Sequence, residues 1–165
     1  MVVVAILTIL TALAAPSFTP MIERWRVRQS MEEMTSTLYF ARTEAVKRGG
    51  RIVIQKVANS ATCTLAPTNE DWGCGWIVFF DADGNCSQNG TEPTLQTSPQ
   101  PANTNLVLPG NGGQINVDRW GAFNGISATA VRLTPNGKTV SDPSSAAICV
   151  SSGGRIRTVA ATAIC

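Results

Sequence analysis

Residues 1–50 read MVVVAILTILTALAAPSFTPMIERWRVRQSMEEMTSTLYFARTEAVKRGG, and this stretch decides the fold. Its first charged residue is Glu23, so an uncharged apolar run leads directly into a basic segment. A helix that crosses the hydrocarbon core of a bilayer needs about 20 apolar residues. We therefore predict a membrane-spanning segment over 1–22, an amphipathic helix over 23–50 and a globular β domain over 51–165.

A cleaved signal peptide is the alternative interpretation of the apolar run. Such a peptide begins with basic residues and ends at small ones, and Leu13-Ala14-Ala15 resembles a cleavage site. No Lys or Arg precedes the run. We expect a retained anchor, and a chain whose start has been trimmed or misassigned. Pro16 and Pro20 are expected to kink or interrupt the helix at the membrane boundary.

The segment 21–48 has the apolar spacing of a helix. Its apolar side chains recur at intervals of four and three residues: Val27, Met31, Met34, Leu38, Ala41 and Ala45. Such a stripe indicates a helix packed along one face. Lys47 and Arg48 place positive charge at the favourable end of the helix dipole, and Gly49-Gly50 ends the helix.

After the helix the apolar period changes to two. Strands are predicted at 51–57, 75–80, 106–108, 114–117, 130–133 and 147–150, separated by turns rich in Pro, Gly and Asn. The polar, proline-bearing stretch Ser87–Thr104 is predicted to be a long loop. One long helix followed only by strands indicates an α+β domain, in which the helix packs on antiparallel β-sheet.

Five cysteines and no histidine favour disulfides over a zinc site, because no CxxC pair has zinc spacing. A bridge between Cys149 and Cys165 would tie down the C-terminal end, and one between Cys63 and Cys74 would staple a hairpin. Cys86 is then unpaired. Sequence alone does not settle the pairing.

Charge is polarised along the chain, although the net charge is only +2. Residues 1–56 and 118–165 are mainly basic, whereas residues 57–117 carry only acidic charges. This asymmetry indicates oriented packing against neighbours, or a polyanion bound at one end.

Catalysis is not expected. Without histidine there is no Ser-His or Cys-His pair, and no nucleophile elbow, phosphate loop or metalloprotease motif is present. Asp81-Ala82-Asp83-Gly84-Asn85, with Glu92 downstream, is similar to a calcium loop, but Cys86 stands where the EF-hand requires glycine. We interpret it as a turn, and expect neither a metal nor a cofactor.

The segment Gly153-Gly154-Arg155-Ile156-Arg157-Thr158 is a stronger candidate for a binding site than the acidic loop. In an extended chain, residues two apart project to the same face, so Arg155 and Arg157 would point together. Two aligned guanidinium groups match phosphate geometry. The alternative is a solvated edge strand whose charges prevent aggregation, and the spacing leaves both interpretations open.

The N-terminal 50 residues resemble the first helix of type IV pilin-like proteins of the GspH/FimT group. The resemblance rests on Ala15-Pro16-Ser17-Phe18 and on residues 38–48 (LYFARTEAVKR), with looser support from residues 72–81 (WGCGWIVFFD) and Gly84-Asn85. The group's processed leader stretch, which includes a glutamate that guides assembly, does not precede Met1.

The resemblance implies a minor subunit of a type IV pilus or a type II secretion pseudopilus. It also implies a single-pass anchor in the bacterial inner membrane before assembly, a periplasmic or extracellular domain, and minor and major pilins as partners. FimT-type members take up DNA in natural transformation through a Gly-Arg-x-Arg element, which Gly154-Arg155-Ile156-Arg157 matches. We expect contacts to DNA phosphates without sequence preference, with help from Lys138 and Arg132 if they share that face. A purely structural pilin or pseudopilin that primes fibre assembly is the alternative.

Overall fold

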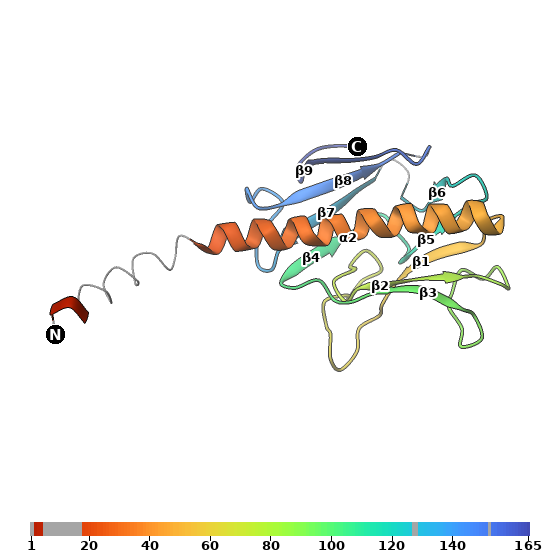
Figure 1. Cartoon of the computed structure of the whole chain (residues 1–165), viewed down its shortest axis with the longest axis horizontal. Coiled ribbons are helices and arrows are strands. Elements are labelled where there is room, and N and C mark those ends of the chain that lie inside the picture. Colours follow the sequence, from red (N-terminus) through yellow and green to blue (C-terminus); the bar gives the residue numbers. More distant parts are fainter. Residues whose placement is uncertain (1, 5–17, 127–128, 152) are drawn as a thin grey trace.

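The structure, a computed structural model, describes residues 2–4, 18–126, 129–151 and 153–165. One long helix, α2 (Thr19–Arg48), lies across two antiparallel sheets (Figure 1). Most of the predicted anchor, including Pro16, lies outside the described residues. Within the described residues, no helix combines the length and the apolar character that a membrane crossing requires.

The helix α2 buries the face that its sequence predicts. Its buried residues are Val27, Ser30, Met34, Thr37, Leu38, Ala41 and Ala45. At the C-terminal end, Gly49 adopts a left-handed conformation with φ of 79°, and its N–H bonds to the carbonyl of Ala45. Pro20 lies in the first turn, where its missing N–H costs no helical bond. The prediction was that Pro16 and Pro20 kink or interrupt the helix. Within the described residues Pro20 lies in the first turn of α2, and the segment before Phe18 lies outside them.

The strands form two sheets. The first sheet has the order β3 (Thr94–Ser98), β2 (Trp76–Phe80), β1 (Ile52–Lys56), β5 (Gln114–Val117) and β6 (Phe123–Asn124). The second has the order β4 (Thr104–Val107), β7 (Thr129–Pro135), β8 (Ala146–Val150) and β9 (Ile156–Ala160). All neighbouring strands are antiparallel, which confirms the predicted α+β class.

The predicted loop Ser87–Thr104 is wrong in its second half, where β3 lies. This strand pairs with β2 at the edge of the first sheet, with an irregularity at Val78/Phe79. Its sequence, TLQTS, is mostly polar because an edge strand can keep one face in water. The pairing is therefore set by the main chain of β2, and the apolar pattern gave no signal of it.

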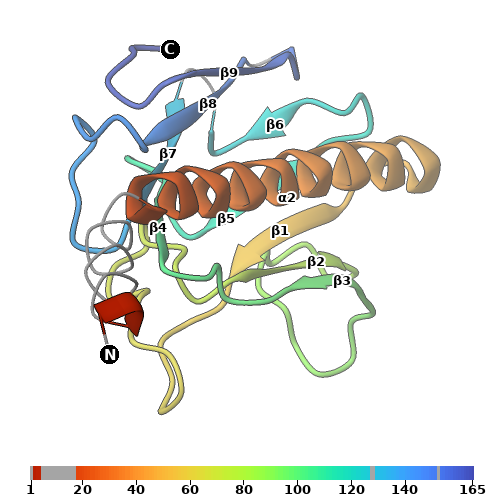
Figure 2. The ribbon, with the colours of Figure 1, turned by 60° about the vertical axis from the view of Figure 1, so that its left-hand side comes forward.

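Both sheets pack against α2 through one continuous core. Trp76 of β2 and Leu133 of β7 are fully buried members of it, together with Leu38 of α2. The indole Nε1 of Trp76 donates a 3.0 Å hydrogen bond to Oγ1 of Thr37. Figure 2 shows α2 running across both sheets. The helix α2 therefore fixes the position of the two sheets relative to each other.

Two disulfides close the loops that the sequence suggested, Cys63–Cys74 and Cys149–Cys165, and Cys86 stays a thiol. The second bridge joins β8 to the last residue of the chain. It therefore encloses the β8–β9 turn and the whole of β9 in one covalent loop.

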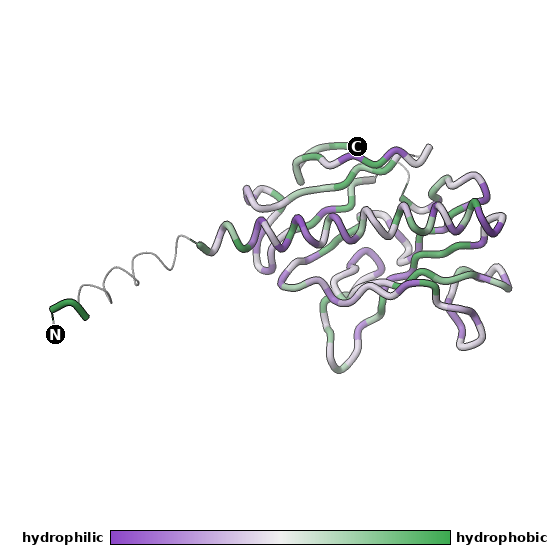
Figure 3. Tube along the Cα trace, in the orientation of Figure 1, coloured by the Kyte–Doolittle hydropathy of each residue, from purple (hydrophilic) through white to green (hydrophobic). Residues whose placement is uncertain are grey.

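The start of α2 projects beyond the sheets, and its apolar residues are shown in Figure 3. Phe18, Met21, Ile22 and Trp25 are all exposed there. Exposed apolar residues gathered at one place are typical of a surface that another molecule covers.

Candidate nucleic-acid interface

The Gly154–Arg157 element leads into β9, the edge strand of the second sheet: Ile156 and Arg157 belong to the strand, and Gly154 and Arg155 lie in the turn before it. Arg157 is directly opposite Cys149 of β8. The N–H of Ser151 donates to the carbonyl of Arg155, and the N–H of Arg155 donates to Oγ of Ser151, each at 3.0 Å. The main chain of the element is thus fixed before and after Arg155.

The two arginines share the sheet face that points away from α2. Ile156 packs against the core, and Thr158 lies beside Glu32 and Ser36 of α2. Side chains alternate along a strand, so Arg157 faces the opposite way. The bond from Ser151 N–H to the Arg155 carbonyl extends the pairing by one residue beyond β9, and the same alternation places Arg155 on the face of Arg157. Both are exposed, and neither forms an ion pair with a described residue. Their charges are available to an external anion.

Arg132 of β7 lies on this same outer face. It alternates with Val131 and Leu133, which are both buried in the core. It pairs with Ala147, two residues along β8 from Cys149, the partner of Arg157. Arg132 is half-buried, and its Nε finds no hydrogen-bond acceptor among the described residues. Its side chain lines a hollow together with Asn105 and Val107 of β4 and Lys138 of the β7–β8 turn, so Arg132 adds positive charge to the outer face without a contact to the two exposed arginines.

Lys138 lies at the other end of the second sheet, in the turn between β7 and β8. The length of β8, five residues or about 16 Å at strand spacing, separates that turn from the turn before β9. Lys138 also pairs with Asp142 at 3.5 Å. The pKa of Asp142 is lowered, first by the N–H of Ser144 and then by Lys138. The structure thus does not bring Lys138 to the two arginines.

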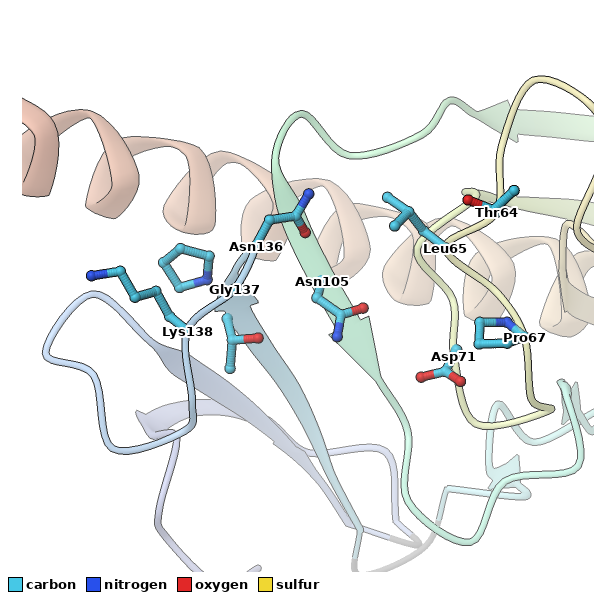
Figure 4. A pocket seen from close by; sticks show the side chains of 10 residues that line it. Thr64, Leu65, Pro67, Asp71, Asn105, Asn136, Gly137 and Lys138 are labelled. Atoms are coloured by element: carbon cyan, nitrogen blue, oxygen red, sulfur yellow. The ribbon is translucent and has the colours of Figure 1, made fainter.

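A hollow of about 320 Å³ lies beside Lys138, between the β7–β8 turn and the loop that carries Asp71. Figure 4 shows the Lys138 side chain extending away from that loop. The side chains that line it, among them Asn105, Asn136 and Asp71, are mixed and mostly neutral. This hollow therefore does not extend the positive surface of β9.

Gly154 is buried and is held by a helix residue that the sequence had not marked as functional. Its carbonyl accepts a 3.1 Å hydrogen bond from Nη1 of Arg42. Gly154 has φ of +79°, and a β-carbon there would lie 2.6 Å from Nη1 of Arg42 and 3.2 Å from the carbonyl oxygen of Gly121. A residue with a β-carbon would be strained at this φ and would have to displace the Arg42 guanidinium. In the sequence, the glycine that directly precedes Arg155 was the sign of this close packing.

The family described as type II transport protein GspH matches residues 30–154. This is well over half of the chain. The chain belongs to the GspH family. The resemblance to pilin-like proteins of the GspH/FimT group is thereby confirmed. The matched region ends at Gly154, so Arg155 and Arg157 lie just beyond it.

Two crystal structures of the type IV minor pilin FimU from Pseudomonas aeruginosa strain PAO1 are similar to this GspH-family chain. One covers 87% of this chain and 95% of FimU, with a TM-score of 0.64 and 20% identity. The other covers 84% and 96%, with a TM-score of 0.61 and 19% identity. At this identity the likeness shows a shared fold. No curated protein gives a significant match.

In this GspH-family chain, the acidic cluster of Asp81, Asp83 and Glu92 organises a loop. The carboxylate oxygens of these residues lie within 4.8 Å of one another. Asp81 accepts the N–H groups of Gly84 and Cys86, and Glu92 accepts those of Ala82 and Asn89. These bonds account for the buried carboxylates of Asp81 and Glu92, in agreement with the turn interpretation.

Proposed function

We propose that this chain is a minor pilin that binds DNA through Arg155 and Arg157 and serves DNA uptake in natural transformation. The observation that supports the proposal best is the pair of exposed guanidinium groups at the start of β9, neither of which forms an ion pair within the part of the chain that the structure describes. Arg155 and Arg157 are two residues apart, about 6.6 Å in a strand. Each DNA strand carries one phosphate per about 3.4 Å of helix axis, so two arginines at this spacing suit two phosphates.

The rest of the site fits binding that does not depend on base sequence. Arginine forms forked hydrogen bonds with phosphate oxygens, and phosphate contacts position a protein on DNA without reading its sequence. Half-buried Arg132 adds to the field on the same face. Binding is therefore expected to weaken steeply as salt is added.

In this proposal the chain is anchored in the bacterial inner membrane before assembly, with its folded part in the periplasm. It joins other minor and major pilins in a type IV pilus, where β9 is presented outside the cell. The exposed apolar start of α2 is suited to pack against the helices of neighbouring pilins.

The decisive experiment is a titration of labelled duplex DNA with the full chain, kept in solution by mild detergent, at two salt concentrations. The double variant Arg155→Ala/Arg157→Ala is expected to weaken binding at least tenfold at low salt. Loss of two phosphate contacts should also reduce the slope of log affinity against log salt by about 1.8.

The matched control is Arg24→Ala/Arg28→Ala, which removes the same charge from two exposed residues at the start of α2. The control should bind DNA nearly as the parent does. Equal losses in both double variants would mean that only total charge matters, and unaltered affinity in the β9 variant would reject the assignment.

A structural role without DNA binding is the second candidate. The family match to a type II transport protein favours it, as does the exposed apolar surface at the start of α2. Such a subunit would prime a pilus or a secretion pseudopilus through protein contacts alone. No duplex binding by the parent chain at low salt, together with binding to a partner pilin, would support this role instead.

A further inference from the structure

A rigid turn between β5 and β6 presents the most exposed aromatic side chain of the described residues. Trp120 is 77% exposed. The Oδ1 of Asp118 accepts the N–H groups of Trp120 and Ala122, at 2.8 and 2.9 Å. The main chain of Asp118 also bonds to Gly121 and Ala122. The turn is thus closed on itself, and its shape does not depend on the indole.

Two neighbouring segments hold this turn in place. On one side, a β-carbon on Gly50, just after α2, would lie 3.1 Å from the backbone nitrogen of Arg119. On the other side, the Arg42 side chain lies between Gly121 and Gly154. An exposed tryptophan on a turn fixed from both sides is poised for a ligand, because little entropy remains to be lost on binding.

The turn lies next to the β9 arginines. The carbonyl oxygen of Gly121 is 3.2 Å from the position of a β-carbon on Gly154. Gly121 and Gly154 make this contact, and Trp120 and Arg155 are their neighbours in the sequence. Figures 1 and 2 both show the turn before β9 close to β6. Arg119 is exposed in the same turn, and Arg42 contacts Gly121, so the residues that flank Trp120 in the fold are basic.

We propose that Trp120 is a stacking platform for an unpaired base, and that the preferred ligand of this surface is single-stranded DNA. The inference rests on the proposed function, since the arginines hold the phosphates beside the platform. Proteins that bind single strands combine a cationic track with aromatic side chains on which bases stack. In a duplex the base faces are covered by their neighbours, so Trp120 adds affinity only when bases are free.

The same indole would suit an apolar contact with another pilin. The charges around it favour the nucleic acid, because Arg42, Arg119 and Arg155 all lie at or next to the turn, and its one carboxylate, Asp118, is engaged by backbone N–H groups. A protein contact at Trp120 would leave the affinities for both forms of DNA unchanged.

The test compares a labelled single strand of about 12 nucleotides, within the usual site size, with the duplex of the same sequence, at one salt concentration. The full chain in mild detergent should bind the single strand more tightly. Trp120→Ala should weaken single-strand binding about tenfold, as expected for the loss of one stacked base, and duplex binding less than about twofold. Trp120→Phe should retain most of the affinity.

Trp25→Ala is the control, because Trp25 is also exposed but lies at the start of α2. It should leave both affinities unchanged. The inference is overturned if Trp120→Ala changes neither affinity or lowers both equally, or if Trp25→Ala matches its effect. Arg155→Ala/Arg157→Ala tests the proposed function separately: if that variant loses duplex binding while Trp120→Ala changes nothing, only the stacking platform fails.

Discussion

Gly154 shows how one residue sets the position of the two arginines. Its buried Cα lies against the Arg42 guanidinium, and its φ of +79° is unfavourable for any residue with a β-carbon. We expect Gly154→Ala to lower the free energy of unfolding by about 1–3 kcal/mol, and DNA affinity to fall although both arginines remain. Thermal denaturation and the duplex titration measure the two effects.

The neighbouring Gly153 supplies the control within the same turn. A β-carbon there would meet no described heavy atom within 4 Å. Gly153→Ala should therefore change stability by less than about 0.5 kcal/mol and leave DNA affinity as it is. Equal effects from the two substitutions would show that general flexibility of the turn matters, and not the contact with Arg42.

At the scale of single residues, the sequence predicted some of the residues of the candidate DNA-binding surface. The shared face of Arg155 and Arg157 was an expectation from their spacing, because alternation in a strand is a local property; in the structure Arg157 lies in β9 and Arg155 just before it. Arg42 was missed because it contacts Gly121 and Gly154, which are far away in the chain. Trp120 was missed because its neighbour Gly121 meets Gly154 only in the folded chain. Such contacts form only when α2 and the two sheets pack together in the folded chain.

At the scale of the helix, Thr37 connects α2 to the first sheet. Its Oγ1 donates to the carbonyl of Glu33 at 2.9 Å and accepts from Nε1 of Trp76 at 3.0 Å in the buried core. Thr37→Val keeps the shape but leaves the indole N–H without its acceptor. We expect a loss of about 1–3 kcal/mol in the free energy of unfolding, measured by denaturant titration.

Thr43 offers a matched control on the same helix. Its Oγ1 makes the same local bond, to the carbonyl of Tyr39 at 2.9 Å, but the residue is exposed. Thr43→Val should cost less than about 0.5 kcal/mol. A similar loss from both substitutions would mean that the local helix bond, and not the bond to Trp76, carries the effect.

The helix and the strands differ in how much of the information that specifies them lies in their own sequence. The stripe from Val27 to Ala45 predicted the buried face of α2, and the apolar run at β5 gave its bounds, Gln114–Val117. β3 and the two-residue β6 were not predicted, because their pairing partners supply the reason for their conformation. The polar strand β3 has no apolar period to detect, and β6 is too short to show one.

At the scale of the whole molecule, α2 packs on both sheets, and each disulfide stabilises a different part. Cys63–Cys74 closes a loop between β1 and β2, in the first sheet's half of the molecule. Cys149–Cys165 clamps β9 and the chain end onto β8. Separations of 11 and 16 residues give similar entropic stabilisation, about 3 kcal/mol each. The two disulfides therefore contribute a similar stabilisation but act on different parts of the molecule.

This difference predicts that only one bridge affects DNA binding. Cys149→Ser/Cys165→Ser and Cys63→Ser/Cys74→Ser should each lower thermal stability by a similar amount, about 3 kcal/mol. Only the first should also weaken duplex binding, because this bridge lies on the sheet face that carries Arg157 and, without it, only non-covalent contacts hold β9 and the chain end to β8. Duplex titration well below the melting temperature of both variants separates the effects. Equal losses of affinity would instead indicate that DNA binding follows global stability.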